Sequence, residues 1–286
     1  YHRSQMMIFR LSGDIKYLSD QLVVLTLSTT MNSYTPILFQ RCTNPNSDKN
    51  SCATKTFSNI MHMMNIVMNS SYPTRIRKMN LCSPFVFEVG DNYLLTVMNG
   101  QVVYIKELFD QYQEMCNSKL NSSFANENEG CCGVISRFIA QRNTKYEFVR
   151  NKNAILRSYS AHAAARHIFS VGYQFIEKMV LYIDPGAAPI LTFDYEDNFL
   201  KREIQESSFR YSPNFYNLFG GEAGVPVFQI GIAAAACSFV DHLESIRSFL
   251  EVLFFDRLHY SKEKNGEEED EELDDLLKVF TPIIIE

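Results

Sequence analysis

The sequence lacks the short motifs that identify most enzymes and cofactor-binding proteins. It contains no Trp, no Cys-x-x-Cys pair and no Cys/His spacing that suits zinc. The glycines at 220–224 match neither a Walker A loop, because no Gly-Lys-Ser/Thr follows them, nor a dinucleotide-binding fingerprint. His162 and His167 are five residues apart, about 140° around a helix, so they do not chelate one metal as an i,i+4 pair does. The sequence therefore predicts no catalytic residue, no cofactor and no metal.

A long apolar run and a disulfide framework are also missing. No stretch of 18 apolar residues occurs, so we expect no membrane span in the given chain. The seven cysteines include Cys42 and Cys52, which flank a polar loop. A disulfide could close that loop, and two free thiols are the alternative in an intracellular protein. An odd cysteine count and the lack of a signal peptide argue against secretion, but the chain begins with Tyr1 rather than Met, which weakens that inference.

Most of the net charge belongs to the C-terminal end. The whole chain carries −6. Residues 261–286 contain ten acidic and three basic residues, a net of −7, so by subtraction residues 1–260 carry about +1. At 286 residues the chain is long enough to bury a sizeable core in one large domain or two small ones.

The apolar residues between Ile230 and Tyr260 recur every three or four positions, which predicts a long helix. We expect this helix, over Ile232–Leu258, to be the most buried long element of the C-terminal half. Four of its residues are expected in the core: Leu243, Ile246, Leu250 and Phe254. Its Ala-rich first half would allow another helix to approach closely.

Three further segments have helical spacing, namely Asp14–Thr30, Thr54–Met68 and Asn153–Ile183. The second carries a stripe of methionines, which we interpret as core, with a partner surface as the alternative. The sequence therefore predicts a mainly α fold that is helical bundle-like, with a cyclin-like arrangement as one form of it.

Residues 84–105 have the sequence pattern of β-strands rather than of a helix. Runs rich in β-branched and aromatic residues are separated by Gly90-Asp91-Asn92 and by Asn99-Gly100, a strong hairpin signal. We expect a small antiparallel β-meander here, leading into a helix. Its strands are expected at Phe85–Val89, Tyr93–Met98 and Gln101–Ile105.

The polar, Asn/Ser-rich stretch at residues 117–130 is typical of a linker. It divides the chain into a helical subdomain with the β-meander at 1–116 and a second helical domain at 131–260. Residues 261–286 would form an acidic interaction tail.

Basic residues are concentrated between Arg137 and Arg166, against the single acid Glu147. This local net of +6 could face phosphate groups of a nucleic acid. A solvated helix face balanced by acids elsewhere is the favoured alternative, because aromatic residues are not interleaved. The candidate phosphate-facing residues are Arg137, Arg142, Lys145, Arg150, Lys152 and Arg157.

The acidic tail continues into an apolar end. The block 267–275 holds eight acidic residues, which oppose folding in isolation. Beyond it the spacing indicates an amphipathic helix followed by three isoleucines, a pattern that favours a docking peptide over a solvating tail. Packing on the chain's own body is the alternative. The residues expected to dock on a partner are Leu273, Leu276, Leu277, Phe280 and Ile284.

Residues 18–113 resemble the N-terminal half of a baculovirus nucleocapsid protein. The resemblance lies in VVLTLSTTMNSYTPILFQR, KTFSNIMHMMNIVM and SPFVFEVGDNYLLTVMNGQVVYIKELFDQY. That family is the envelope/capsid component of the occlusion-derived virion and has been described as a viral cyclin. The resemblance implies a mainly helical structural protein of a large invertebrate DNA virus, located in the virion nucleocapsid and, during assembly, in the host nucleus. Its partners would be other viral structural proteins or copies of itself, with nucleic acid as a further partner through Arg137–Arg166.

The sequence therefore favours a non-enzymatic assembly protein. A cyclin-like regulatory binding module is one alternative. An enzyme without a recognisable motif is another, and its candidate groups would be Asp194, Glu196 and Asp197, or His242 beside Asp241 and Glu244.

Overall fold

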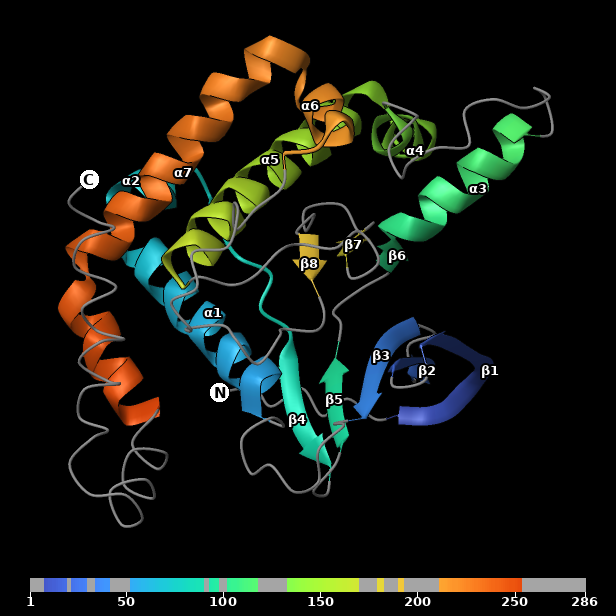
Figure 1. Cartoon of the computed structure of the whole chain (residues 1–286), viewed down its shortest axis with the longest axis horizontal. Coiled ribbons are helices and arrows are strands. Elements are labelled where there is room, and N and C mark those ends of the chain that lie inside the picture. Colours follow the sequence, from blue (N-terminus) through green and yellow to red (C-terminus); the bar gives the residue numbers. More distant parts are fainter. Residues whose placement is uncertain are drawn as a thin grey trace.

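Two antiparallel sheets and a set of helices make up the part of the chain that the structure describes (Figure 1). The computed structural model describes residues 8–19, 22–29, 34–41, 52–89, 93–97, 102–117, 133–169, 179–182, 190–192 and 211–253. The fold is mainly α-helical with antiparallel β-structure, as predicted, but its β-structure is larger than one small meander. The cyclin-like form of this fold stays a prediction.

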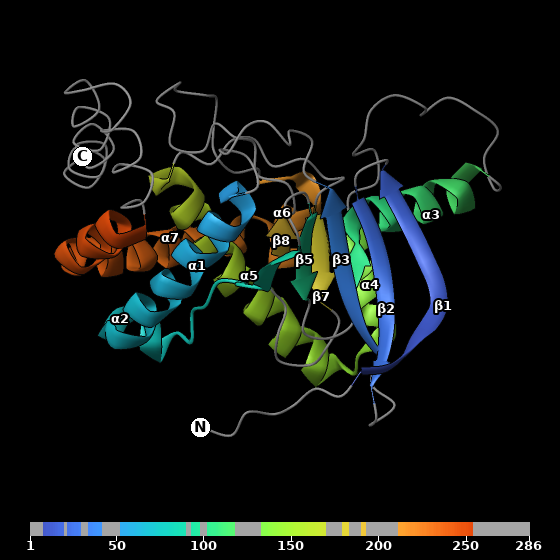
Figure 2. The same ribbon diagram turned by 90° about the horizontal axis from the view of Figure 1, so that it is seen from below.

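The larger sheet has five strands in the order β1-β2-β3-β5-β4, and Figure 2 shows it as a separate layer beside the helices. Neighbouring strands are antiparallel throughout. The strands are β1 (Ile8–Ser19), β2 (Leu22–Thr29), β3 (Tyr34–Arg41), β4 (Phe85–Val89) and β5 (Tyr93–Val97).

The helix expected over Asp14–Thr30 is wrong, because this segment forms most of β1 and β2. Its leucine spacing fits a helix, but β2 pairs on both sides, with Val23 opposite Tyr17 on β1 and Phe39 on β3. Strand preference depends on such cross-strand neighbours, which a local pattern does not reveal.

The first hairpin of the expected meander is confirmed by β4 and β5, which pair from Phe85–Val97 to Val89–Tyr93. The partner predicted for the third strand is wrong. This strand, β6 (Val102–Tyr104), pairs with β7 (Met179–Tyr182), which in turn pairs with β8 (Ile190–Thr192). The expected turn at Asn99-Gly100 lies outside the described residues.

The helices are α1 (Cys52–Ser70), α2 (Tyr72–Ile76), α3 (Ile105–Asn117), α4 (Val134–Arg142), α5 (Lys145–Ile168), α6 (Pro213–Phe219) and α7 (Gly224–Asp241). The short 3-10 helix η2 (Gly221–Ala223) precedes α7, and residues 243–253 are helical after it.

The bounds expected for Asn153–Ile183 are wrong at both ends. Helix α5 begins eight residues earlier, at Lys145, because Thr144 and Glu147 form a capping box there. It ends at Ile168, and Met179–Tyr182 is strand β7 instead.

The helix expected over Ile232–Leu258 is interrupted at His242. The His242 ring nitrogen Nδ1 lies 2.9 Å from the carbonyl oxygen of Ser238, the group that the His242 amide would bond in a continuous helix. Ile246 and Leu250 are buried as expected, Leu243 is partly buried against the core, and Phe254 lies outside the described residues. Helix α5, rather than this segment, is the most buried long element.

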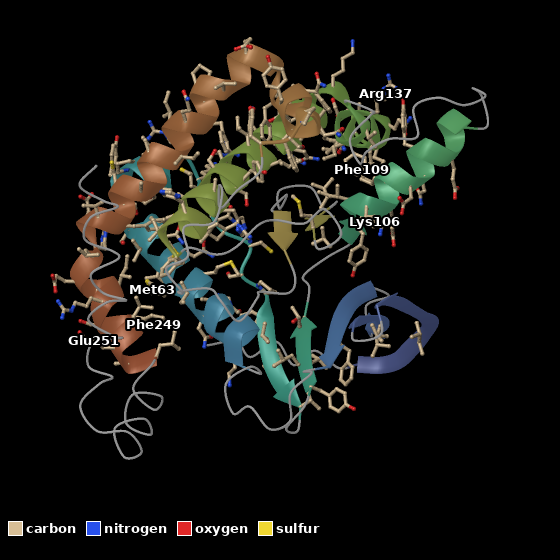
Figure 3. All side chains as sticks on the ribbon, viewed as in Figure 1. Met63, Lys106, Phe109, Arg137, Phe249 and Glu251 are labelled. Carbon is tan, nitrogen blue, oxygen red and sulfur yellow. The ribbon has the colours of Figure 1, made fainter. Side chains whose placement is uncertain are left out.

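The main core joins α1, α5, α7 and the helical residues 243–253. The methionine stripe of α1 is buried in it, which confirms its interpretation as core, and Figure 3 shows Met63 beside Phe249. Because α1 shares this core with α5 and α7, the parts of the chain on either side of 117–130 are packed together. The predicted domain boundaries stay a prediction.

Helices α5 and α7 approach closely where Gly231 faces Ser160. A Cβ atom on Gly231 would lie 2.6 Å from the Cβ and Oγ atoms of Ser160. The Ala-rich first half of the helix predicted at Ile232–Leu258 indicated such a close approach, and Ala161, Ala164 and Ala235 are buried in the core that the two helices share.

We therefore expect Gly231→Leu to lower the free energy of unfolding by about 1–3 kcal/mol, because the larger side chain forces the two helices apart. Chemical denaturation followed by circular dichroism measures the effect. Gln229→Leu, at an exposed position of the same helix, is the matched control and should change stability little. Equal stability of the two variants would contradict the close α5–α7 contact.

Candidate interaction surface

Exposed basic and apolar side chains meet where α4 ends and α5 begins. Arg142, Lys145 and Arg150 are exposed, together with Tyr146 at 76% and Val149 at 52%. These five residues define the α4–α5 surface. Tyr146, Val149 and Arg150 share one side of α5, because residues three and four apart are neighbours on a helix.

The local sequence explains how this surface is built. Thr144 receives a hydrogen bond from the amide of Glu147, and the Glu147 carboxylate accepts bonds from the Thr144 amide and hydroxyl, both at 2.9 Å. These bonds lower the pKa of Glu147, with the Thr144 amide as the first cause. The single acid of the basic segment is therefore held at the N-terminus of α5, where the helix dipole favours it.

Aromatic rings hold two of the predicted basic residues in place. Arg137 on α4 donates a hydrogen bond of 2.5 Å to the Tyr112 hydroxyl of α3, and its guanidinium lies 5.5 Å from the centre of that ring. The guanidinium of Arg142 lies 4.4 Å from the centre of the Phe138 ring. Arg137 thus connects α4 to α3, whereas Arg142 remains at the edge of the α4–α5 surface.

The remaining basic residues are not gathered on one face. Lys152 is half-buried, and its Nζ atom would lie 3.4 Å from a Cβ on Gly220, the C-cap of α6. A cation at this helix end is favoured by the dipole. Arg157 is half-buried with a buried Nε atom, and Arg166 is buried. The structure therefore brings together Arg142, Lys145 and Arg150 and directs Lys152, Arg157 and Arg166 elsewhere.

Sequence reasoning missed Tyr146 and Val149. Their signal is an apolar pair three residues apart inside a basic segment. The expected partner-docking residues of the tail, Leu273 to Ile284, and the acids Asp194, Glu196 and Asp197 lie outside the described residues.

The side chain of His242 makes contacts at the C-terminal end of α7. Its Nδ1 atom contacts the Ser238 carbonyl, and its Nε2 atom lies 3.2 Å from the Ser70 hydroxyl at the end of α1. Nδ1 is thus held at the C-terminal end of α7, and Nε2 joins that end to α1. Among the described residues, no group of three His, Cys, Asp or Glu side chains could hold a metal ion.

His162 is buried in α5 and supports the segment before β4. Its Nε2 atom accepts a hydrogen bond of 3.1 Å from the Cys82 amide, which requires a neutral ring protonated on Nδ1. Burial lowers the pKa of His162 to about 3, and the charge of Arg166 contributes in the same direction.

Comparison with known proteins finds a likeness in structure alone. No protein-family model matches the chain, and no curated protein sequence matches it. Two solved structures are similar over 99% of the chain at 14% identity. They are titled "Complete CtTel1 dimer with C2 symmetry" and "FAT and kinase domain of CtTel1", with TM-scores of 0.68 and 0.67. The chain corresponds to 12% and 22% of those longer chains, so the likeness establishes the fold.

The buried neutral His162 predicts a loss of stability in acid. Below pH 6.5 the unfolded chain binds a proton on this residue and the folded chain does not until pH about 3. The free energy of unfolding should therefore fall by about 1.4 kcal/mol for each pH unit below 6.5. Denaturation experiments should show that His162 lowers the free energy of unfolding by about 2 kcal/mol between pH 6.5 and pH 5. In His162→Gln, this contribution to the pH dependence should be missing. An identical pH dependence in both proteins would contradict the buried neutral ring.

Proposed function

We propose that this chain is a non-catalytic protein-assembly module with a kinase-like fold. Three antiparallel strands come first, α1 and α2 follow the third strand, and the β4–β5 hairpin leads to a mainly helical second part. A strand followed by a helix at this point is the arrangement that holds the Lys–Glu ion pair of protein kinases. The likeness to a structure whose title names a kinase domain supports this assignment at the level of fold.

One observation carries the non-catalytic part of the proposal. Strand β3, with the sequence YTPILFQR, contains no lysine, and the 19 residues of α1 include neither Asp nor Glu. Both partners of the ion pair that positions ATP phosphates in kinases are therefore missing from the elements that would supply them.

The sequence also lacks the other motifs of active protein kinases, which supports the non-catalytic part of the proposal. The chain contains no G-x-G-x-x-G, no H-R-D and no D-F-G. Residues 170–178, between Phe169 and strand β7, read SVGYQFIEK and include neither the Asp that serves as catalytic base nor the Asn that binds Mg²⁺ in kinases. Asp194 is an acid that follows β8 in the sequence, where kinases place a metal-binding Asp.

The assembly part of the proposal is supported by the α4–α5 surface and the sequence of the tail. The surface combines Arg142, Lys145 and Arg150 with exposed Tyr146 and Val149. The tail combines eight acids at 267–275 with apolar residues in helical spacing. Opposite charge favours their encounter, and burial of the apolar residues would hold them together.

The finer predictions rest on the family resemblance alone. A nucleocapsid role in a large invertebrate DNA virus, other viral structural proteins as partners and location in the virion or host nucleus stay proposals. Contact with nucleic acid through Arg137–Arg166 also stays a proposal. A nucleic-acid phosphate backbone would engage the exposed arginines without needing Tyr146 or Val149, so the two kinds of partner can be separated by mutation.

The non-catalytic part of the proposal predicts that Mg²⁺ and ATP do not stabilise the protein and that the protein does not transfer phosphate from ATP. The melting temperature should be unchanged by millimolar Mg-ATP, because the phosphate-binding ion pair is missing. A general kinase substrate with radiolabelled ATP should remain unlabelled, with an active protein kinase as positive control. Label transfer that Asp194→Ala abolishes would show a working active site and overturn the proposal.

Deletion of residues 267–286 should leave the body folded and weaken its self-association, measured by sedimentation velocity. Tyr146→Ser with Val149→Ser should weaken it in the full chain, and Ile66→Ser, at an exposed position on α1, is the matched control. Added salt should weaken the association only in part, because it screens charge and not apolar burial. Unchanged association of the truncated chain at low and high salt would exclude tail docking.

A further inference from the structure

We draw no further inference here: the strongest candidate, the exposed apolar face that Phe85, Phe87 and Val89 of β4 form with Tyr93 of β5, is a surface for which nothing in the structure shows what covers it.

Discussion

The close contact between α5 and α7 is the constraint on which the rest of the structure depends. Gly231 faces Ser160 with no room for a Cβ atom, and the alanines on both sides keep the two helix backbones near each other. Helix α1 packs its methionines against this pair, and His162 of α5 holds the Cys82 amide ahead of β4. The pair of helices thus supports both the helical core and the entry into the five-stranded sheet.

A consequence of this packing is that two surfaces with apolar side chains remain exposed. The N-terminal turns of α5 extend beyond the contact with α7 and expose Tyr146, Val149 and Arg150. Helix α7 packs on α5, α1 and α2 with one side, which leaves Ile230 on its other side exposed.

Much of the helical part could be predicted from the residues. The apolar spacing of Thr54–Met68 locates α1, and the alanines near Ser160 and Gly231 indicate the close packing of α5 and α7. The hairpin Phe85–Val97 follows from its alternation and turn residues. The basic segment was also identified, but not which of its arginines are exposed. That depends on α6, whose C-cap lies beside Lys152, and on α3, whose Tyr112 binds Arg137.

The sequence by itself determined features that arise between residues close in the chain, namely the helical period of α1, the β4–β5 hairpin and the distribution of charge. Only the tertiary structure decided that residues 14–30 form strands, that β6 joins β7 some 75 residues further on, and that His242 interrupts a helix. Each of these depends on a partner that is distant in sequence or on competition between a side chain and the backbone. Such pairings compensate for lost chain entropy only when the whole fold brings the partners together.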